Sequence, residues 1–554
     1  TNMSNIAVLG GGISGLTTAY YLSKLAPHGT KIILMEGSNR LGGWIKSCRV
    51  APGDYGLDRQ IPLSSNADMK NDNDVLFEGG PRTLRPVGPG GVVTLDLIRD
   101  LNLTDNLVAI PKTHSSARHR YIYYEDRINT LPSSLKGMLL NPPPIMKSVL
   151  LSGMKEMFVE KSTADDESIY DFTERRFGTH VAKNLVGAMV HGIYAGDAKE
   201  LSLRTTLKML WENEQAFGSV VKGMLRGGAK MDRFRERGMM TRARNNDPEW
   251  FGEMEAMSVL GFKNGVDSLT RALGQWLEQQ DNVEIRTGEN VESLDLTTGG
   301  DCKIVTSKGT IHASHTVSTI PATHLDKIIS SKIPHLNFNR HVDVAVVNLA
   351  YANDQAKLDY DGFGFLTPHI SSQHTHPVPG TLGVVFDSNA LSGQEKDAPL
   401  KLTAMLGGHM WDSAFDKSIH DIDPKIVRDR AIQVAERHLG IKAAPSHTMT
   451  HLHAGCIPQY KVGHYQRLGE MHAAIQSKFG NALSVTGASY FGVSVPDCIK
   501  NARELVEELT VSGALGSRSK VVTGLDRVEE GNANERLRDS ANISKGHIDV
   551  LMKS

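Results

Sequence analysis

Three glycines near the start of the chain, Gly10, Gly12 and Gly15, have the type and spacing that could bind a dinucleotide. They follow the apolar run 6–9, and G-x-G-x-x-G after a strand predicts a tight turn, close approach of a pyrophosphate, and close helix packing. The pyrophosphate would lie at the N–H groups that open the following helix. Glu36 comes 36 − 15 = 21 residues after Gly15, where a carboxylate can bind ribose hydroxyls. The spacing predicts a dinucleotide-binding βαβ unit; the alternative is a βαβ unit whose glycines serve only packing.

Two further glycine-rich regions lie far apart in the sequence. Arg40-Leu-Gly-Gly-Trp44 follows Glu36 and predicts a second tight turn, and Phe77-Glu-Gly-Gly-Pro-Arg-Thr-Leu-Arg comes next. Near the other end, residues 483–499 predict a strand that enters a glycine turn and then a helix. The pattern of Arg40 with the glycine pair 42–43, downstream of the predicted ribose carboxylate, resembles that of the flavin-dependent amine oxidase superfamily.

This resemblance implies an α/β (α+β) fold with a discontinuous Rossmann-like FAD-binding domain of the GR2 type. A mixed substrate domain and a largely helical, membrane-facing insertion would complete the chain. In that superfamily the C-terminal motif returns to the first domain and places a helix N-terminus against the flavin ring. The implied flavin-binding residues are Gly10, Gly11, Gly12, Ile13, Ser14, Gly15, Glu36, Gly37, Arg40, Gly43, Trp44, Gly80, Pro81, Arg82, Thr83, Val291, Ala488, Val493, Ser494 and Val495.

Longer runs resemble the protoporphyrinogen oxidase family of animals and fungi. They include residues 10–16, 80–86, 192–197, 451–460 and 487–499, and they extend from Ile6 to about Leu509. The resemblance implies one non-covalent FAD per chain and a six-electron oxidation of protoporphyrinogen IX, at the penultimate step of haem biosynthesis. Molecular oxygen would be reduced to hydrogen peroxide. No catalytic residue beyond the flavin is implied, because the cofactor carries the redox chemistry.

The same resemblance implies five substrate-binding residues. Arg120 would pair with a propionate, because a planar guanidinium binds a carboxylate through two hydrogen bonds; its neighbours Arg118 and His119 are the alternatives. Gly192 would let the backbone approach the pyrrole N–H groups, or it would end a helix. The remaining three would contact the faces of the tetrapyrrole or belong to the core: Phe363, Leu366 and Met405.

The composition describes an ordinary globular protein of 554 residues, with 40% hydrophobic residues and a formal net charge of −1. The absence of a basic excess argues against a nucleic-acid partner.

The four cysteines form no CxxC pair and indicate neither a disulfide framework nor a zinc ribbon. Cys498 could attach the flavin or be a packed thiol. His451, His453 and Cys456 could bind a metal or be structural.

The motifs divide the chain into six segments. We assign residues 1–90, 256–321 and 449–512 to the FAD-binding domain, 91–255 to the helical insertion and 322–448 to the substrate domain. Residues 513–554 form a polar tail that we expect to be loosely ordered. The stretch 226–250 is rich in Arg, Lys and Gly without clear periodicity, and it predicts a surface loop.

Two other functions fit the same scaffold. An FAD-dependent amine or polyamine oxidase would need an acidic or aromatic cage for its cationic substrate rather than an arginine. A flavin-free chaperone of the GDP-dissociation-inhibitor kind would not need an intact glycine motif, whereas here every flavin element is present.

Membrane attachment, if present, should be peripheral. No stretch approaches the roughly 18 apolar residues of a spanning helix. Because the first predicted strand begins at Ile6, we expect no signal or transit peptide ahead of it, so any organelle address would be internal or would have been removed. Residues 132–161 combine an apolar stripe with scattered lysines, which predicts either a membrane contact or a helix with a solvated basic face. The resemblance implies the intermembrane-space side of the mitochondrial inner membrane and hand-off of product to a ferrochelatase. The resemblance does not decide whether the protein is a monomer or a homodimer.

Overall fold

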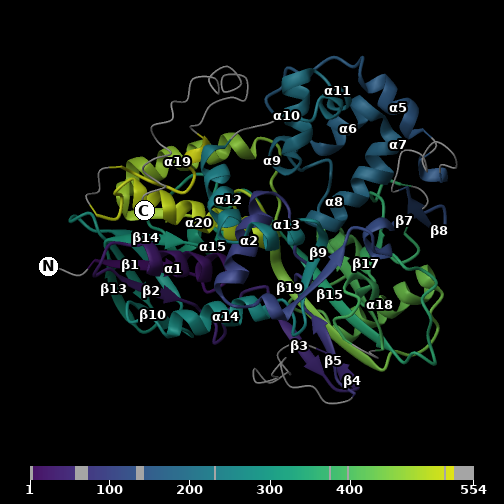
Figure 1. The fold of residues 1–554 in the computed structure, drawn as a ribbon, viewed down its shortest axis with the longest axis horizontal. Helices are drawn as coiled ribbons and strands as arrows, with labels where there is room; N and C mark the ends of the chain where they lie inside the picture. The colour runs from purple at the N-terminus through teal and green to yellow at the C-terminus, as the bar shows by residue number, and fades with distance from the viewer. Residues whose placement is uncertain are drawn as a thin grey trace.

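The computed structural model describes residues 4–56, 73–132, 143–146, 148–229, 233–372, 376–395, 399–516 and 520–528 (Figure 1). The predicted membrane segment 132–161 lies partly outside these residues, as does the predicted tail beyond residue 528. A five-stranded sheet and an eight-stranded sheet organise the described chain, the first on the left of Figure 1 and the second on the right.

The five-stranded sheet has the order β10-β2-β1-β14-β20, and all its neighbouring strands are parallel. The strands are β1 Asn5–Leu9, β2 Lys31–Met35, β10 Val283–Arg286, β14 His315–Ser318 and β20 Leu483–Val485. The buried runs of β1 and β2 are apolar on both faces, as expected for a parallel sheet covered on two sides. Three sequence segments therefore build one sheet, as the discontinuous domain requires.

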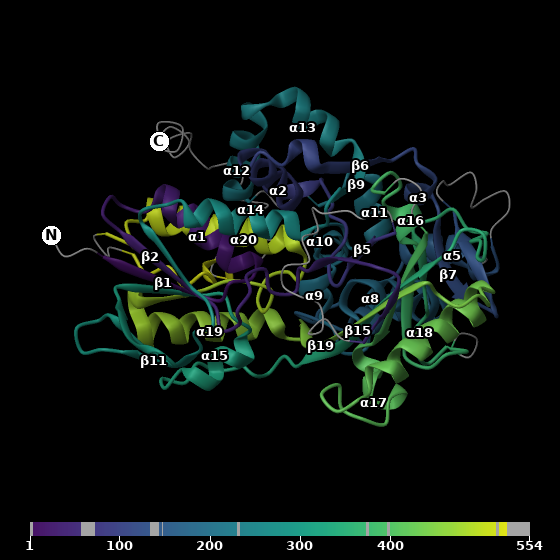
Figure 2. The same cartoon turned by 90° about the horizontal axis from the view of Figure 1, so that it is seen from below.

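Different elements cover the two faces of this sheet (Figure 2). Ile6 and Val8 face α1 Ile13–Leu25, α14 Asp267–Glu278 and α20 Val495–Val511. Side chains alternate along a strand, so Ala7 and Leu9 face the opposite cluster. That cluster contains the sheet β11 Val291–Leu296, β12 Cys302–Thr306 and β13 Gly309–Ala313, with α15 Ala322–Ile328 and α19 His464–Phe479.

The eight-stranded sheet has the order β4-β19-β15-β18-β17-β16-β7-β8 and is mixed. Its strands are β4 Gly53–Tyr55, β7 Arg120–Tyr124, β8 Arg127–Leu131, β15 His341–Tyr351, β16 Gly364–Leu366, β17 Thr381–Val385, β18 Leu400–Gly407 and β19 His447–Pro458. One face packs against α18 Pro424–Leu439. Two strand pairs lie beside the sheets: β3 Ser47–Val50 with β5 Val75–Glu78, and β6 Leu107–Pro111 with β9 Met257–Phe262.

Helices fill most of the segment between residues 88 and 255. They are α2 Gly88–Asp100, α3 Ser115–Arg118, α5 Val149–Glu156, α6 Ile169–Phe177, α7 Thr179–Val181, α8 Gly187–Tyr194, α9 Leu203–Thr206, α10 Lys208–Phe217, α11 Val220–Leu225, α12 Phe234–Asn246 and α13 Pro248–Glu255. The prediction of a surface loop at 226–250 was wrong. The arginines of this segment pair with carboxylates on α20, as in the Arg233–Glu504 bridge of 2.7 Å. Helix α12 buries only Met239 and Ala243, so its apolar side is too sparse to form a recognisable helical stripe.

Part of the segment predicted as a loosely ordered tail has a defined place. Residues 520–528, which we call the C-terminal strap, lie against β20, where Val485 donates its N–H to Thr523 O at 2.8 Å. Val522 and Leu525 are buried. The polar composition did not reveal these two anchors. In the described part of the chain, no helix has the length and apolar character needed to cross a membrane.

Candidate functional site

The first glycine turn leaves open space at one glycine only. A Cβ on Gly10, Gly11 or Gly15 would lie within 2.9 Å of a neighbouring atom, and on Gly15 it would be 1.8 Å from Gly10 O. A Cβ on Gly12 would meet nothing closer than the Gly43 Cα at 3.8 Å. Gly12 caps α1 without any side-chain hydrogen bond, so N–H groups there remain for an anion. Packing within the fold therefore requires glycine at positions 10, 11 and 15. At position 12 the protein itself leaves room for a side chain, so the predicted pyrophosphate is the reason for glycine there.

The predicted ribose-binding carboxylate is held at the end of β2. Glu36 accepts hydrogen bonds from the N–H groups of Gly11 at 2.7 Å and Ser38 at 2.8 Å. These bonds fix the carboxylate and leave it lone pairs for hydroxyl donors. Gly37 lies directly against Asn290, the neighbour of Val291, because a Cβ there would be 2.3 Å from the Asn290 side chain. Residues predicted from two distant segments therefore meet beside Glu36.

The second glycine turn is held by Arg40. Its guanidinium donates to the carbonyls of Leu41 and Ile45 at 3.0 Å and also to that of Gly43. Gly42 donates to Gly11 O at 2.8 Å, which joins the two glycine turns. Arg40 thus supports the turn with its guanidinium directed to backbone oxygens.

The loop 79–87 lies next to this second turn. Gly80 lies so close to Trp44 that a Cβ there would be 2.2 Å from the Trp44 carbonyl oxygen. Arg82 is 7% exposed and forms an ion pair with Asp387 at 2.7 Å. Its guanidinium therefore pairs with the substrate domain and supports this loop, and Pro81 and Thr83 flank it.

The C-terminal motif reaches the same edge of the five-stranded sheet. Gly487 lies near Ser14, since a Cβ there would be 3.5 Å from the Ser14 Oγ. Tyr460 is buried; its hydroxyl donates to Ala488 O and accepts the Gly492 N–H at 3.0 Å. Ser494 follows Val493 and caps α20, where its Oγ accepts the Asp497 N–H at 3.1 Å, so Val495 begins the helix. All three predicted pieces of the flavin site converge at one place.

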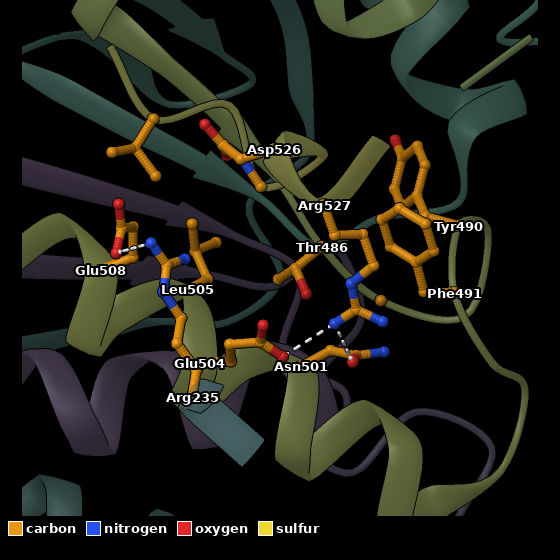
Figure 3. Close-up of a pocket in the computed structure, with 13 residues that line it drawn as sticks. Arg235, Thr486, Tyr490, Phe491, Asn501, Glu504, Leu505, Glu508, Asp526 and Arg527 are labelled. Atoms are coloured by element: carbon orange, nitrogen blue, oxygen red, sulfur yellow. Dashed lines mark hydrogen bonds and ion pairs between the residues drawn. The ribbon is translucent and has the colours of Figure 1, made fainter. Parts of the chain in front are cut away.

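The C-terminal strap lies against this motif, with Arg527 beside Phe491, Asn501 and Glu504 (Figure 3). Arg527 lies over the Phe491 ring at 4.3 Å and donates to Asn501 at 3.0 Å and Glu504 at 2.8 Å. The cavity among these residues has a volume of about 30 Å³, which is enough for ordered water. This region is therefore a polar support for the loop 486–492.

One cross-strand row of the eight-stranded sheet links the predicted substrate residues to the flavin motifs. Ile122, Leu366, Gly383, Met405, Val346 and His451 are directly opposite one another in successive strands. Opposite residues share one face of a sheet. His451 lies 2.5 Å from the position of a Cβ on Gly79, beside the second glycine turn. The row begins at the substrate residues and ends at the flavin motifs.

Gly383 is a residue in this row that the sequence analysis missed. A Cβ on Gly383 would lie 2.9 Å from the Leu366 side chain. Glycine at this position of β17 therefore lets the Leu366 side chain lie over β17, which separates Leu366 on β16 from Met405 on β18. Only the strand register places it there, and the sequence around Gly383 carries no motif.

Arg120 begins β7 and is half-buried on the face of that row, because it precedes Ile122 by two residues. Its guanidinium lies 4.6 Å from the centroid of the Phe363 ring. Phe363 therefore supports the arginine. The alternative Arg118 is exposed at the end of α3, and His119 pairs with Asp361 at 2.7 Å. The geometry favours Arg120.

Gly192 faces Leu366 from α8. A Cβ on Gly192 would be 2.9 Å from the Leu366 methyl groups. The helix continues to Tyr194 and ends at Ala195 in the left-handed conformation, so Gly192 does not end a helix. The adjacent His191 donates from Nδ1 to Thr367 O at 2.8 Å and contacts His409 Nε2 at 2.9 Å. Burial lowers the pKa of His191 to about 3, which keeps it neutral.

The candidate metal ligands do not come together. His451 and His453 stack with centroids 5.7 Å apart, His453 donates to Gly79 O at 2.5 Å, and Cys456 lies against Val342 O. Among the residues that the structure describes, no three His, Cys, Asp or Glu side chains are arranged to hold a metal. Burial raises the pKa of Cys498 to about 12, so its thiol stays protonated and unreactive at neutral pH.

Comparison with known proteins agrees with this geometry. The family described as flavin containing amine oxidoreductase matches residues 13–510. The protoporphyrinogen oxidase of Homo sapiens is 34% identical over 504 residues, covering 90% of this chain and 97% of that protein. The chain belongs to the protoporphyrinogen oxidases. The Schizosaccharomyces pombe protoporphyrinogen oxidase is 33% identical over 514 residues, covering 91% and 98%.

Solved structures support the fold assignment. Cyclohexylamine oxidase from Brevibacterium oxydans superposes with a TM-score of 0.60 and 12% identity, covering 92% of this chain and 99% of that one. At that identity the likeness concerns the fold alone. As a protoporphyrinogen oxidase family member, the chain is a flavin-dependent oxidoreductase.

Buried neutral histidines should make this protein sensitive to acid. Burial lowers the pKa of His438 to about 4, below the unfolded value of roughly 6.5. The neutral folded form therefore stabilises the protein above pH 6.5, and this contribution is lost as the pH falls from 6.5 towards 4. The free energy of unfolding should fall by roughly 2 kcal/mol per such histidine between pH 7 and 5. Denaturant unfolding at both pH values measures this loss.

A matched pair of variants tests the assignment. His438 stacks on Phe365 with centroids 5.2 Å apart, so His438→Phe keeps the packing and removes the titration. It should reduce the difference in stability between the two pH values, whereas the exposed His420→Gln should not. An unchanged difference in His438→Phe would show that this residue does not contribute.

Proposed function

We propose that this protein binds FAD non-covalently and oxidises protoporphyrinogen IX to protoporphyrin IX with molecular oxygen. The observation that carries the proposal is the cross-strand row, which joins the arginine face of the eight-stranded sheet to the flavin motifs. Family membership supports it, since the relatives of human, bovine and fungal origin are protoporphyrinogen oxidases. The amine oxidase and chaperone alternatives lack comparable support.

The residues present fit FAD. Open space beside Gly12, the uncapped start of α1 and the fixed Glu36 carboxylate suit a pyrophosphate and a ribose. The protonated Cys498 suits non-covalent binding. When bound, FAD supplies hydride acceptance and the later return of electrons to oxygen.

The chain itself would bind and orient the substrate. Arg120 would hold a propionate, because a desolvated guanidinium favours a carboxylate partner. Leu366 and Met405 would supply apolar contacts on the same face, and Gly192 faces Leu366 from α8. These contacts exclude water from a flat apolar ring. Positioning, rather than a protein acid or base, is the task of these residues.

A porphyrinogen assay tests the proposal. The purified protein should show flavin absorption bands and should convert protoporphyrinogen IX to a fluorescent porphyrin while it consumes oxygen and releases peroxide. A colourless protein, or peroxide formed only with amines, would contradict it.

We also propose peripheral attachment to the intermembrane-space side of the mitochondrial inner membrane. Exposed apolar side chains gather on α5 and α11, in the upper right of Figure 1, and these two helices are in contact. Phe158, two residues after the end of α5, is 85% exposed, and Leu225, the last residue of α11, is 78% exposed. Insertion of such side chains into a bilayer interface would hold the protein near a ferrochelatase that takes the product. Pairing into a homodimer is a further part of this proposal.

Detergent, rather than salt, should release the protein from mitochondrial membranes, because salt screens charges without weakening apolar insertion. Phe158→Asp combined with Leu225→Asp should move most of it into the soluble fraction. Ile426→Asp, on the exposed side of α18, is the matched control and should leave it bound. Release by salt alone would reject apolar insertion.

A further inference from the structure

The loop 79–87 brings a second arginine towards Arg120. Leu84 in this loop is fixed by two hydrogen bonds to Leu260, each 2.8 Å, and Arg82 is fixed by its ion pair with Asp387 at 2.7 Å. Arg85 follows these two anchors and is exposed. These anchors hold the loop in place, so the fold sets the backbone position of Arg85.

The other side of the Arg82 ion pair leads directly to Arg120. Asp387 follows Phe386, whose N–H donates to Phe363 O at 2.9 Å, and the Phe363 ring lies under the Arg120 guanidinium. Arg85 and Arg120 are therefore anchored to the same corner, one through the loop and one through β7. The two positive charges lie close enough to interact across this corner, and burial, together with the charge of Arg85, lowers the pKa of Arg120.

Neither guanidinium has a carboxylate partner among the described residues. Nearby acidic groups are engaged elsewhere: Asp387 binds Arg82 and Thr403, and Asp361 binds His119 and Tyr121. Two like charges held near each other without a counter-charge repel, and two carboxylates would relieve that repulsion. The arrangement is typical of a site for a doubly anionic ligand.

We propose that Arg85 binds the second carboxylate of a dicarboxylic tetrapyrrole while Arg120 binds the first. This assignment rests on the proposed function and adds the recognition of the second propionate to it. The two propionates of protoporphyrinogen IX lie on neighbouring pyrroles, so two arginines at one corner would bind that edge. The uncharged edge would then face the apolar row with Leu366 and Met405. Arg85 would thereby determine the orientation of the tetrapyrrole, with its propionate edge towards the two arginines.

The test compares binding of the porphyrin diacid with binding of its monomethyl and dimethyl esters. Protoporphyrin IX fluorescence titrations on the flavin-loaded protein give affinity without turnover. Arg85→Ala should weaken binding of the diacid about fivefold to tenfold, as for a charge pair near the surface. It should leave flavin content and binding of the dimethyl ester unchanged. Arg85→Lys should recover part of the loss, since charge without the planar fork remains.

The ester comparison separates recognition from structural damage. In the wild type, methylation of the propionate that Arg85 binds should weaken binding; in Arg85→Ala that same methylation should have no further effect. Arg118→Ala, which removes another exposed arginine, should bind all ligands like the wild type. Equal loss for diacid and diester in Arg85→Ala would overturn the assignment, as would full affinity for the diacid.

Failure of the proposed function has a different signature. A wild-type protein that binds the porphyrin but does not oxidise the porphyrinogen would contradict the oxidase function. The ester comparison would still test whether Arg85 binds a propionate. A wild-type protein that binds no porphyrin would overturn both.

Discussion

Gly12→Val should give a folded protein that purifies without flavin and has no oxidase activity. A side chain at Gly12 would meet no protein atom closer than 3.8 Å at its Cβ, so the fold should accept it. The same side chain would occupy the place where the pyrophosphate must approach the backbone. We expect flavin absorbance per protein to fall below about a tenth of the wild-type value, while thermal unfolding in the apo form stays nearly unchanged. Absorbance spectra and apo-protein melts measure both.

Gly15→Val is the contrasting variant. Its Cβ would lie 1.8 Å from Gly10 O, so this change should destabilise the fold itself. Loss of flavin in both variants with loss of stability only in Gly15→Val would separate ligand space from packing. Full flavin content in Gly12→Val would show that the N-terminal turn does not hold the pyrophosphate.

Arg120→Ala should raise the KM for protoporphyrinogen IX about 30-fold while flavin content stays normal. Removing one partner of a desolvated charge pair costs about 2 kcal/mol or more, and Arg120 is half-buried over Phe363. Because the glycine turns of the proposed flavin site lie at the five-stranded sheet and Arg120 lies on the eight-stranded sheet, the flavin spectrum should not change. Steady-state kinetics at saturating oxygen measure KM and kcat separately.

Arg120→Lys provides the control for charge. It keeps the positive charge but loses the planar fork and the stacking on Phe363, so it should show an intermediate KM. An unchanged KM in Arg120→Ala would mean that the propionate is held in solvent or by another residue.

The sequence predicts which segments meet at the proposed flavin site, because the signals of these segments are local. Each glycine turn carries its own spacing, and the strand before it and the helix after it are visible in the same stretch. The meeting of Gly37 with the segment that leads into Val291, and of Ser14 with Gly487, followed from the resemblance and is seen in the geometry. The motifs, taken together with the family resemblance, were therefore enough to assign these segments.

The substrate half was less accessible to sequence reasoning. Gly383 and His451 face the site only through the register of the eight-stranded sheet, which no local pattern encodes. The hydrogen-bonded pair His191 and His409 is separated by more than two hundred residues. Helix α12 was missed because its contacts with α20 are ionic, so the apolar period that predicts a helix was absent.

The strand order of the five-stranded sheet has a consequence for the order of folding. Strand β1 lies between β2 and β14, and β20 forms the outer edge on the β14 side. During synthesis β1 and β2 leave the ribosome early, but β14 follows after about 280 further residues and β20 near the end of the chain. Until then β1 has one unpaired edge that can join another chain. The nascent protein should therefore depend on chaperones, and fragments that stop before β14 should aggregate.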